Sequence, residues 1–182
     1  MKTPFLVGPR LYLRPLEESD VTEDYVAWLN QEDITRFLET GKFPTTPERV
    51  REFVRHFTGS NTDIGLAVIL KENDQHVGNV TLSRINWIHR NAETGLMLGR
   101  KDSWGQGYGG EALSLLLEYA FERLGLRKIV GHAVADNQVS IKMVQRLGFR
   151  IEGTLREHYF VAGAFHDGVI LGLFQHEFQK QH

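Results

Sequence analysis

Four glycines lie between Gly105 and Gly110, directly before an apolar run with helical spacing. At the start of a helix the first N–H groups have no partner within the helix, and the helix dipole adds partial positive charge. Glycine would let an anion such as a phosphate touch the backbone there. The other interpretation is a tight turn that only allows close packing of the helix on a sheet. The glycines by themselves are compatible with both interpretations.

Three of these glycines, Gly105, Gly107 and Gly110, also match G-x-G-x-x-G, the fingerprint of dinucleotide binding. The context argues against it, because residues 99–104 separate the preceding strand from the loop, whereas a dinucleotide-binding turn is tight. The earlier strands also look antiparallel. Nicotinamide-dependent redox chemistry is therefore the weaker, competing prediction.

Hydrophobic periodicity places the glycine loop between a strand and a helix, in one α+β domain over residues 1–182. The expected strands cover residues 11–14, 64–70, 77–86, 92–98, 128–135, 150–159 and 165–174. The expected helices run from a cap at Ser19 or Asp20 to about residue 30, over 33–38, from Thr46 and Pro47 to 57, over 109–124, and over 137–147 before Gly148.

Composition narrows the classes of function. The chain has 182 residues, a net charge of −2 and no cysteine, which excludes a cysteine nucleophile and thiolate metal ligands. The charges are mixed, so no nucleic-acid surface is expected, and no apolar run is long enough to cross a membrane. The histidines lack ligand spacing, so we expect no metal site. We expect a cytoplasmic protein and leave its oligomeric state open, a homodimer included.

Four longer segments carry a more specific signal than the glycine loop. They are LYLRPLEESD from residue 11, AETGLMLGRKDSWGQGYGGEAL from 92, DNQVSIKMVQRLGFRIEGTLRE from 136 and AFHDGVILGLF from 164. Together they resemble the GNAT superfamily of acetyl-CoA-dependent N-acetyltransferases, in particular the branch with ribosomal-protein N-terminal acetyltransferases and spermidine acetyltransferase. The resemblance implies a mixed sheet of about seven strands, splayed between the fourth and fifth, with helices on both faces and acetyl-CoA in the opening.

The resemblance also implies which residues bind acetyl-CoA. The pyrophosphate loop would be Trp104-Gly105-Gln106-Gly107-Tyr108-Gly109, followed by Gly110, with Trp104 in place of the usual arginine or glutamine. The strand end at Met97, Leu98 and Gly99 would pair with pantetheine, and N–H groups near Leu98 and Gly99 would polarise the acetyl carbonyl. Asn137 and Ser140 match an N-x-x-S motif that would follow the pantetheine arm.

Transfer to an amine also needs a proton for the leaving thiolate and a base for the amine. Many members of the superfamily use a tyrosine seven residues after the asparagine as the acid, but that residue is Val144 here. The candidate acid is then Ser140, or a water that it holds, although Ser140 could equally be a helix-cap residue. Glu93 is the candidate base, or an exposed strand-end residue, and Tyr159 is a second catalytic candidate that could instead shape the pocket.

The acceptor is predicted to be a primary amine. Trp28, Asn30, Trp87 and His89 are candidate acceptor-binding residues, with core packing as the alternative for the tryptophans. A weak base favours an α-amine, whose pKa is about 7.8, over a lysine-like amine at about 10.4. We therefore predict direct transfer from acetyl-CoA to a protein N-terminus, or else to a small amine such as an amino sugar or polyamine. A non-catalytic acyl-CoA-binding module is the alternative from another class, which Val144 supports.

Overall fold

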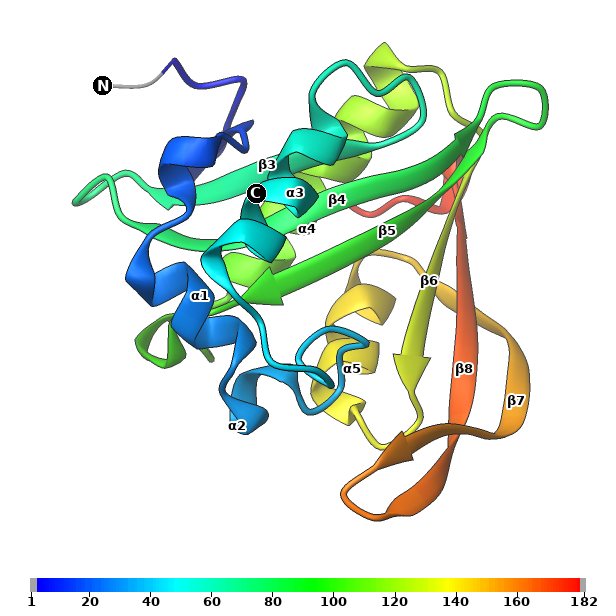
Figure 1. The fold of residues 1–182 in the computed structure, drawn as a ribbon. Coiled ribbons are helices and arrows are strands. Elements are labelled where there is room, and N and C mark those ends of the chain that lie inside the picture. The colour runs from blue at the N-terminus through cyan, green and yellow to red at the C-terminus, as the bar shows by residue number, and fades with distance from the viewer. Residues whose placement is uncertain (1–2, 181–182) are drawn as a thin grey trace.

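The computed structural model describes residues 3–180, and within them eight strands form one mixed sheet in the order β1-β2-β3-β4-β5-β6-β8-β7 (Figure 1). The strands are β1 (Leu6–Val7), β2 (Leu11–Pro15), β3 (Ile64–Leu70), β4 (His76–Asn86), β5 (Asn91–Leu98), β6 (Lys128–Val134), β7 (Arg150–Val161) and β8 (Ala164–Phe174). The α+β prediction is confirmed, with the two-residue β1 added to the seven expected strands.

Helices cover both faces of this sheet. They are α1 (Glu23–Leu29), α2 (Glu32–Thr35), α3 (Pro47–Phe57), α4 (Tyr108–Glu118) and α5 (Gln138–Arg146). Side chains alternate along a strand, so Leu11 and Leu13 join the core with α4, while Tyr12 joins a second core with α1 and α3. The sheet is therefore buried from two sides, and a ligand can reach β4 and β5 only where the covering elements leave a gap.

The sheet opens between β5 and β6. These two strands pair in parallel only from Asn91 to Glu93, opposite Lys128 to Val130, and then diverge (Figure 1). The predicted splay is confirmed at this position. The other strand pairs are antiparallel. That arrangement excludes the competing dinucleotide-binding fold, which is built from parallel βαβ halves.

The first helix begins later than predicted. Its cap is Thr22, whose hydroxyl accepts a hydrogen bond from the Tyr25 N–H at 3.3 Å. Asp20 is instead buried and accepts two hydrogen bonds of 2.7 Å from the buried Arg14 guanidinium. A buried arginine requires a paired carboxylate, so this need outweighs the capping preference of the aspartate.

The helix after the glycine loop also differs at its far end. The α-helix ends at Glu118, and a π-helical turn from Tyr119 to Arg123 continues the apolar stripe. Within residues 3–180, no helix is long and apolar enough to cross a membrane. The same residues contain no group of three or more histidine or acidic side chains placed to hold a metal ion.

Candidate active site

The glycine loop enters α4 through backbone that favours glycine. Gly105 and Gly107 have φ angles of 73° and 81°, in the left-handed region. The first hydrogen bond of the helix runs from the Glu111 N–H to the Gly107 carbonyl, at 3.1 Å. The N–H groups of residues 108–110 come before it in the chain, so they have no acceptor within the helix. The loop thus has the backbone that an anion site at a helix N-terminus needs.

Glu111, in the first turn of α4, points away from this anion site. Its carboxylate is buried and accepts hydrogen bonds from the N–H groups of Arg10 at 2.8 Å and Leu11 at 3.2 Å. The Arg10 side chain donates to the same carboxylate at 2.8 Å and to the Gln106 carbonyl at 2.7 Å. The Arg10–Glu111 pair therefore ties the loop to the start of β2 and neutralises a charge that would repel phosphate.

The glycines of the loop serve different needs. A Cβ on Gly109 would lie 3.1 Å from Leu96 and 3.2 Å from Met143, so this glycine allows α4 to pack closely on β5 and α5. A Cβ on Gly105 would meet nothing within 4 Å. Gly109 is therefore needed for close packing of the helix, as the packing interpretation predicts. Gly105 instead has a left-handed backbone with open space beside it, as the anion-binding interpretation predicts.

Trp104 closes the loop against the end of β5. Its indole N–H donates to the Leu98 carbonyl at 2.9 Å. The Gly99 N–H donates to the Val77 carbonyl at 2.9 Å, so its predicted role in polarising the acetyl carbonyl is wrong. Backbone groups of a strand alternate between its two edges, which turns those of Leu98 and Leu96 toward the splay.

The splay contains a cavity of about 160 Å³, which we call the splay pocket. It brings Asn137, Ser140 and Val144 of the α5 region together with Leu96 of β5. The Asn137 side chain accepts a hydrogen bond from the Ser140 N–H at 3.3 Å, so the residue that caps α5 is Asn137 and not Ser140. Ser140 nevertheless lines the pocket, where its hydroxyl can also meet a ligand.

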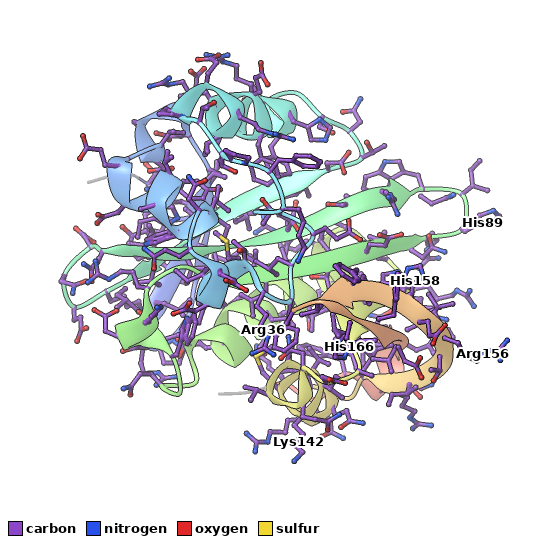
Figure 2. The ribbon with its side chains drawn as sticks, turned by 60° about the horizontal axis from the view of Figure 1, so that its bottom comes forward. Arg36, His89, Lys142, Arg156, His158 and His166 are labelled. Atoms are coloured by element: carbon purple, nitrogen blue, oxygen red, sulfur yellow. The ribbon has the colours of Figure 1, made fainter. Side chains whose placement is uncertain are left out.

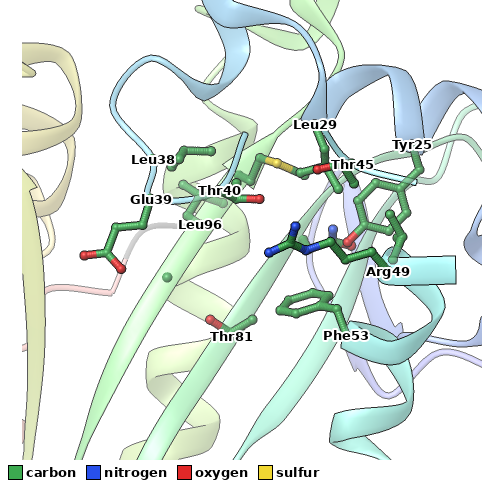
Figure 3. Close-up of a pocket in the computed structure, with 14 residues that line it drawn as sticks. Tyr25, Leu29, Leu38, Glu39, Thr40, Thr45, Arg49, Phe53, Thr81 and Leu96 are labelled. Carbon is green, nitrogen blue, oxygen red and sulfur yellow. The ribbon is translucent and has the colours of Figure 1, made fainter. Parts of the chain in front are cut away.

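A second cavity, of about 480 Å³, lies between β4 and β5 and the helices α1 and α3 (Figure 3). We call it the larger pocket. Its lining residues are Tyr25, Leu29, Leu38, Glu39, Thr40, Thr45, Arg49, Val50, Phe53, Asn79, Thr81, Gly95, Leu96 and Met97. Leu38, Gly95 and Leu96 also line the splay pocket. The two pockets therefore meet at the point where β5 has left β6.

Two charged residues line the larger pocket, and sequence reasoning missed both. Glu39 lies on the irregular segment between α2 and α3, where no periodicity indicates a direction. Arg49 lies in the first turn of α3, among residues that read as its polar face. Figure 3 shows the two side chains entering the pocket from opposite sides.

Trp28 and Asn30 support the larger pocket without lining it. Trp28 is buried against His76, with their ring centroids 5.3 Å apart, and fills the space beside Gly99. Asn30 exchanges two hydrogen bonds of 2.9 Å with the backbone of Thr45, which is a lining residue. For Trp28, the core-packing alternative is therefore correct.

Trp87 and His89 lie outside the described cavities. They occupy the bend between β4 and β5, where the Trp87 indole donates to the Asn61 carbonyl at 2.8 Å and His89 lies at the hairpin tip (Figure 2). The bend precedes Asn91, whereas the pockets meet near Leu96. Five residues of strand span about 16 Å, and neither residue lines the larger pocket or the splay pocket, so their acceptor contact stays a prediction that these two pockets do not support.

Glu93 and Tyr159, the two other catalytic candidates, line neither the larger pocket nor the splay pocket. Both oxygens of Glu93 accept from one Arg84 nitrogen, at 2.9 and 3.0 Å, and Glu93 lines neither pocket. Tyr159 lines a third cavity of about 180 Å³ together with Glu39. Burial raises the pKa of the Tyr159 phenol, and the Glu39 carboxylate raises it further. The phenol therefore keeps its proton at neutral pH and can donate but not accept one.

Comparisons with known proteins agree with this architecture. A family model described as an acetyltransferase (GNAT) domain matches residues 10–150. The chain is 30% identical to "Uncharacterized N-acetyltransferase p20" of Bacillus licheniformis, over 95% of this chain and 97% of that protein. It is 26% identical to the spermidine N(1)-acetyltransferase of Escherichia coli K12, over 93% and 89%. The spermidine N-acetyltransferase of Vibrio cholerae, solved with CoA and spermine, aligns with a TM-score of 0.84 and 25% identity, over 92% and 97%.

Proposed function

The chain belongs to the GNAT family and is an acetyl-CoA-dependent N-acetyltransferase, and we propose that its acceptor is a primary amine of low pKa bound in the larger pocket. The observation that supports this proposal is the junction of the two pockets at Leu38, Gly95 and Leu96. An acyl chain in the splay pocket and an amine in the larger pocket would meet there. Direct transfer then needs no nucleophile from the protein.

Acetyl-CoA supplies an activated thioester, and the residues of the splay fit such a molecule. We assign its pyrophosphate to the N–H groups of Tyr108, Gly109 and Gly110, which start α4 without competition from Glu111. We assign the pantetheine arm to the open edge of β5, next to Ser140 in the splay pocket. The Leu98 N–H remains the candidate donor to the acetyl oxygen.

The departing thiolate needs a proton, and Ser140 is the candidate donor because it lines the splay pocket. Val144 lines the same pocket, so the position at which many relatives carry a tyrosine offers no donor. Tyr159 is the second candidate, because its raised pKa keeps it protonated. Its cavity adjoins the larger pocket through Leu38 and Glu39.

Two carboxylates compete for the role of base. Glu93 stays a prediction, but it would have to leave Arg84 to accept a proton. Glu39 lines the larger pocket and forms no ion pair with another residue of the range 3–180. We therefore assign to Glu39 the binding of the incoming ammonium group and the removal of its proton, directly or through water.

The pKa of the acceptor amine determines what fraction of it is already neutral, and therefore how strong a base the enzyme needs to remove the proton. At pH 7 roughly one α-amine in seven is neutral, whereas only about one lysine-like amine in a few thousand is. A single exposed carboxylate such as Glu39 is a weak base, which is sufficient for an α-amine but not for a lysine-like amine. We therefore place a protein N-terminal α-amine first and a small amine such as an amino sugar second. A polyamine such as spermidine, the substrate in the names of two of the relatives above, comes third.

The test is release of CoA thiol from acetyl-CoA in the presence of different amines. The panel contains short peptides with free and blocked N-termini, an amino sugar and spermidine. We expect faster release with free N-termini and no acceleration with blocked ones. If no amine accelerates release, the proposed acceptor class is wrong, and a protein that only binds acyl-CoA becomes the better description.

A further inference from the structure

We infer that the acceptor carries an oxyanion, a carboxylate or a phosphate, a few bonds from its amine, and that Arg49 binds this group. The inference rests on the proposed function, because it concerns the same larger pocket. It narrows the acceptor from any low-pKa amine to one with charges of both signs. It also separates this chain from polyamine acetylation.

Arg49 differs from the other arginines of α3 in having no carboxylate partner. Arg51 pairs with Glu48 at 3.3 Å, and Arg55 pairs with Glu48 and Glu18, each at 2.9 Å. No carboxylate within residues 3–180 forms an ion pair with Arg49. The arginine without a partner on this helix is thus the one that lines a cavity.

Arg49 lies in the first turn of α3 and lines the larger pocket. Its own N–H donates to the Thr46 hydroxyl at 3.3 Å, which fixes the first turn of α3. Figure 3 shows the Arg49 guanidinium extending toward the centre of the pocket, on the side from which Phe53 also enters. A guanidinium binds carboxylate and phosphate with two parallel hydrogen bonds.

The two charged residues on opposite sides of the pocket would orient a bound acceptor. Glu39 enters on one side and Arg49 on the other, with Leu96 and Thr81 between them in Figure 3. An acceptor with its amine toward Glu39 and the junction at Gly95 places its remaining atoms toward Arg49. An oxyanion there would be attracted, whereas a second ammonium group would be repelled. Spermidine therefore fits this pocket less well than a peptide or sugar of the same length with a negative charge.

Matched pairs of acceptors test the inference. One pair is a peptide with aspartate as its second residue and the same peptide with asparagine. The other pair is glucosamine and glucosamine 6-phosphate. Spermidine completes the panel. We expect kcat/KM to be at least tenfold higher for the charged member of one pair or both, and the better pair identifies whether a peptide or a sugar supplies the oxyanion.

The matched variants are Arg49→Gln and Arg51→Gln, which remove one arginine each from the same helix. Arg49→Gln should lower kcat/KM for the charged acceptor at least tenfold and for its neutral partner less than twofold, at unchanged Tm. Arg51→Gln should change neither. Equal rates for charged and neutral acceptors that Arg49→Gln does not alter would overturn the inference and leave the proposed function intact. Absence of acetylation across the whole panel would overturn both.

Discussion

Replacement of Glu111 tests whether the Arg10–Glu111 pair holds the glycine loop in place. In Glu111→Ala, the fully buried Leu11 N–H loses its acceptor, which costs about 1–3 kcal/mol. Water can partly replace the bonds to Arg10, whose side chain is 50% exposed, so they add only about 1 kcal/mol. We therefore expect a loss of about 3 kcal/mol in the free energy of unfolding. Glu111→Gln keeps an oxygen for the two backbone N–H groups and should lose about 1 kcal/mol.

The assay is urea denaturation, with the KM for acetyl-CoA measured on the same samples. A loss of about 3 kcal/mol would lower Tm by roughly 6–12 °C in a chain of this size. Because Arg10 also binds the Gln106 carbonyl, both variants should raise the KM for acetyl-CoA. Glu48→Ala breaks only exposed ion pairs and is the control that should leave both quantities nearly unchanged. Wild-type unfolding and wild-type KM in Glu111→Ala would refute the reasoning.

Three further changes probe the loop, the base and a buried histidine. Gly107→Ala forces a side chain into a φ of 81°, at about 1–2 kcal/mol, and should raise the KM for acetyl-CoA, while Gly153→Ala meets no atom within 4 Å and should not. Glu39→Gln should lower kcat about 100-fold and Glu93→Gln less than threefold, measured by thiol release; the reverse order would identify Glu93 as the base. Burial lowers the pKa of His76, so the unfolded chain binds the proton first as the pH falls. Its stabilising contribution should be complete above pH of about 6.5 and be lost below it, so His76→Gln should flatten the dependence of Tm on pH between about 7.5 and 5.

Sequence reasoning succeeds where local chemistry determines the structure. Thr46 caps α3 through its hydroxyl, Pro47 follows in the first turn, and the strand over Ile64–Leu70 has the predicted bounds. The glycine loop and the splay agree with the resemblance because its motifs are contiguous in the chain. In each case, neighbouring residues carry the information.

Sequence reasoning fails where a side chain contacts a residue that only the fold brings next to it. Glu111 lies about a hundred positions from Arg10, and no local pattern shows that the pair buries the carboxylate. Asp20 is of a residue type that often caps helices, but in the fold its carboxylate pairs with the buried Arg14. Glu39 lies on an irregular segment, so its position in the pocket depends on how that segment crosses β5.

Gly95 shows why the two pockets can meet at all. Side chains alternate along β5, so Leu96 and Leu98 pack toward α4, while Met97 packs toward α1 and α3. Gly95 adds no side chain to either layer, and it lines both pockets. A Cβ there would lie 2.8 Å from the Thr81 hydroxyl, so even alanine would crowd the junction. An acyl group on one side of β5 and an amine on the other therefore approach each other most closely beside this glycine, next to the strand edge that β6 has left open.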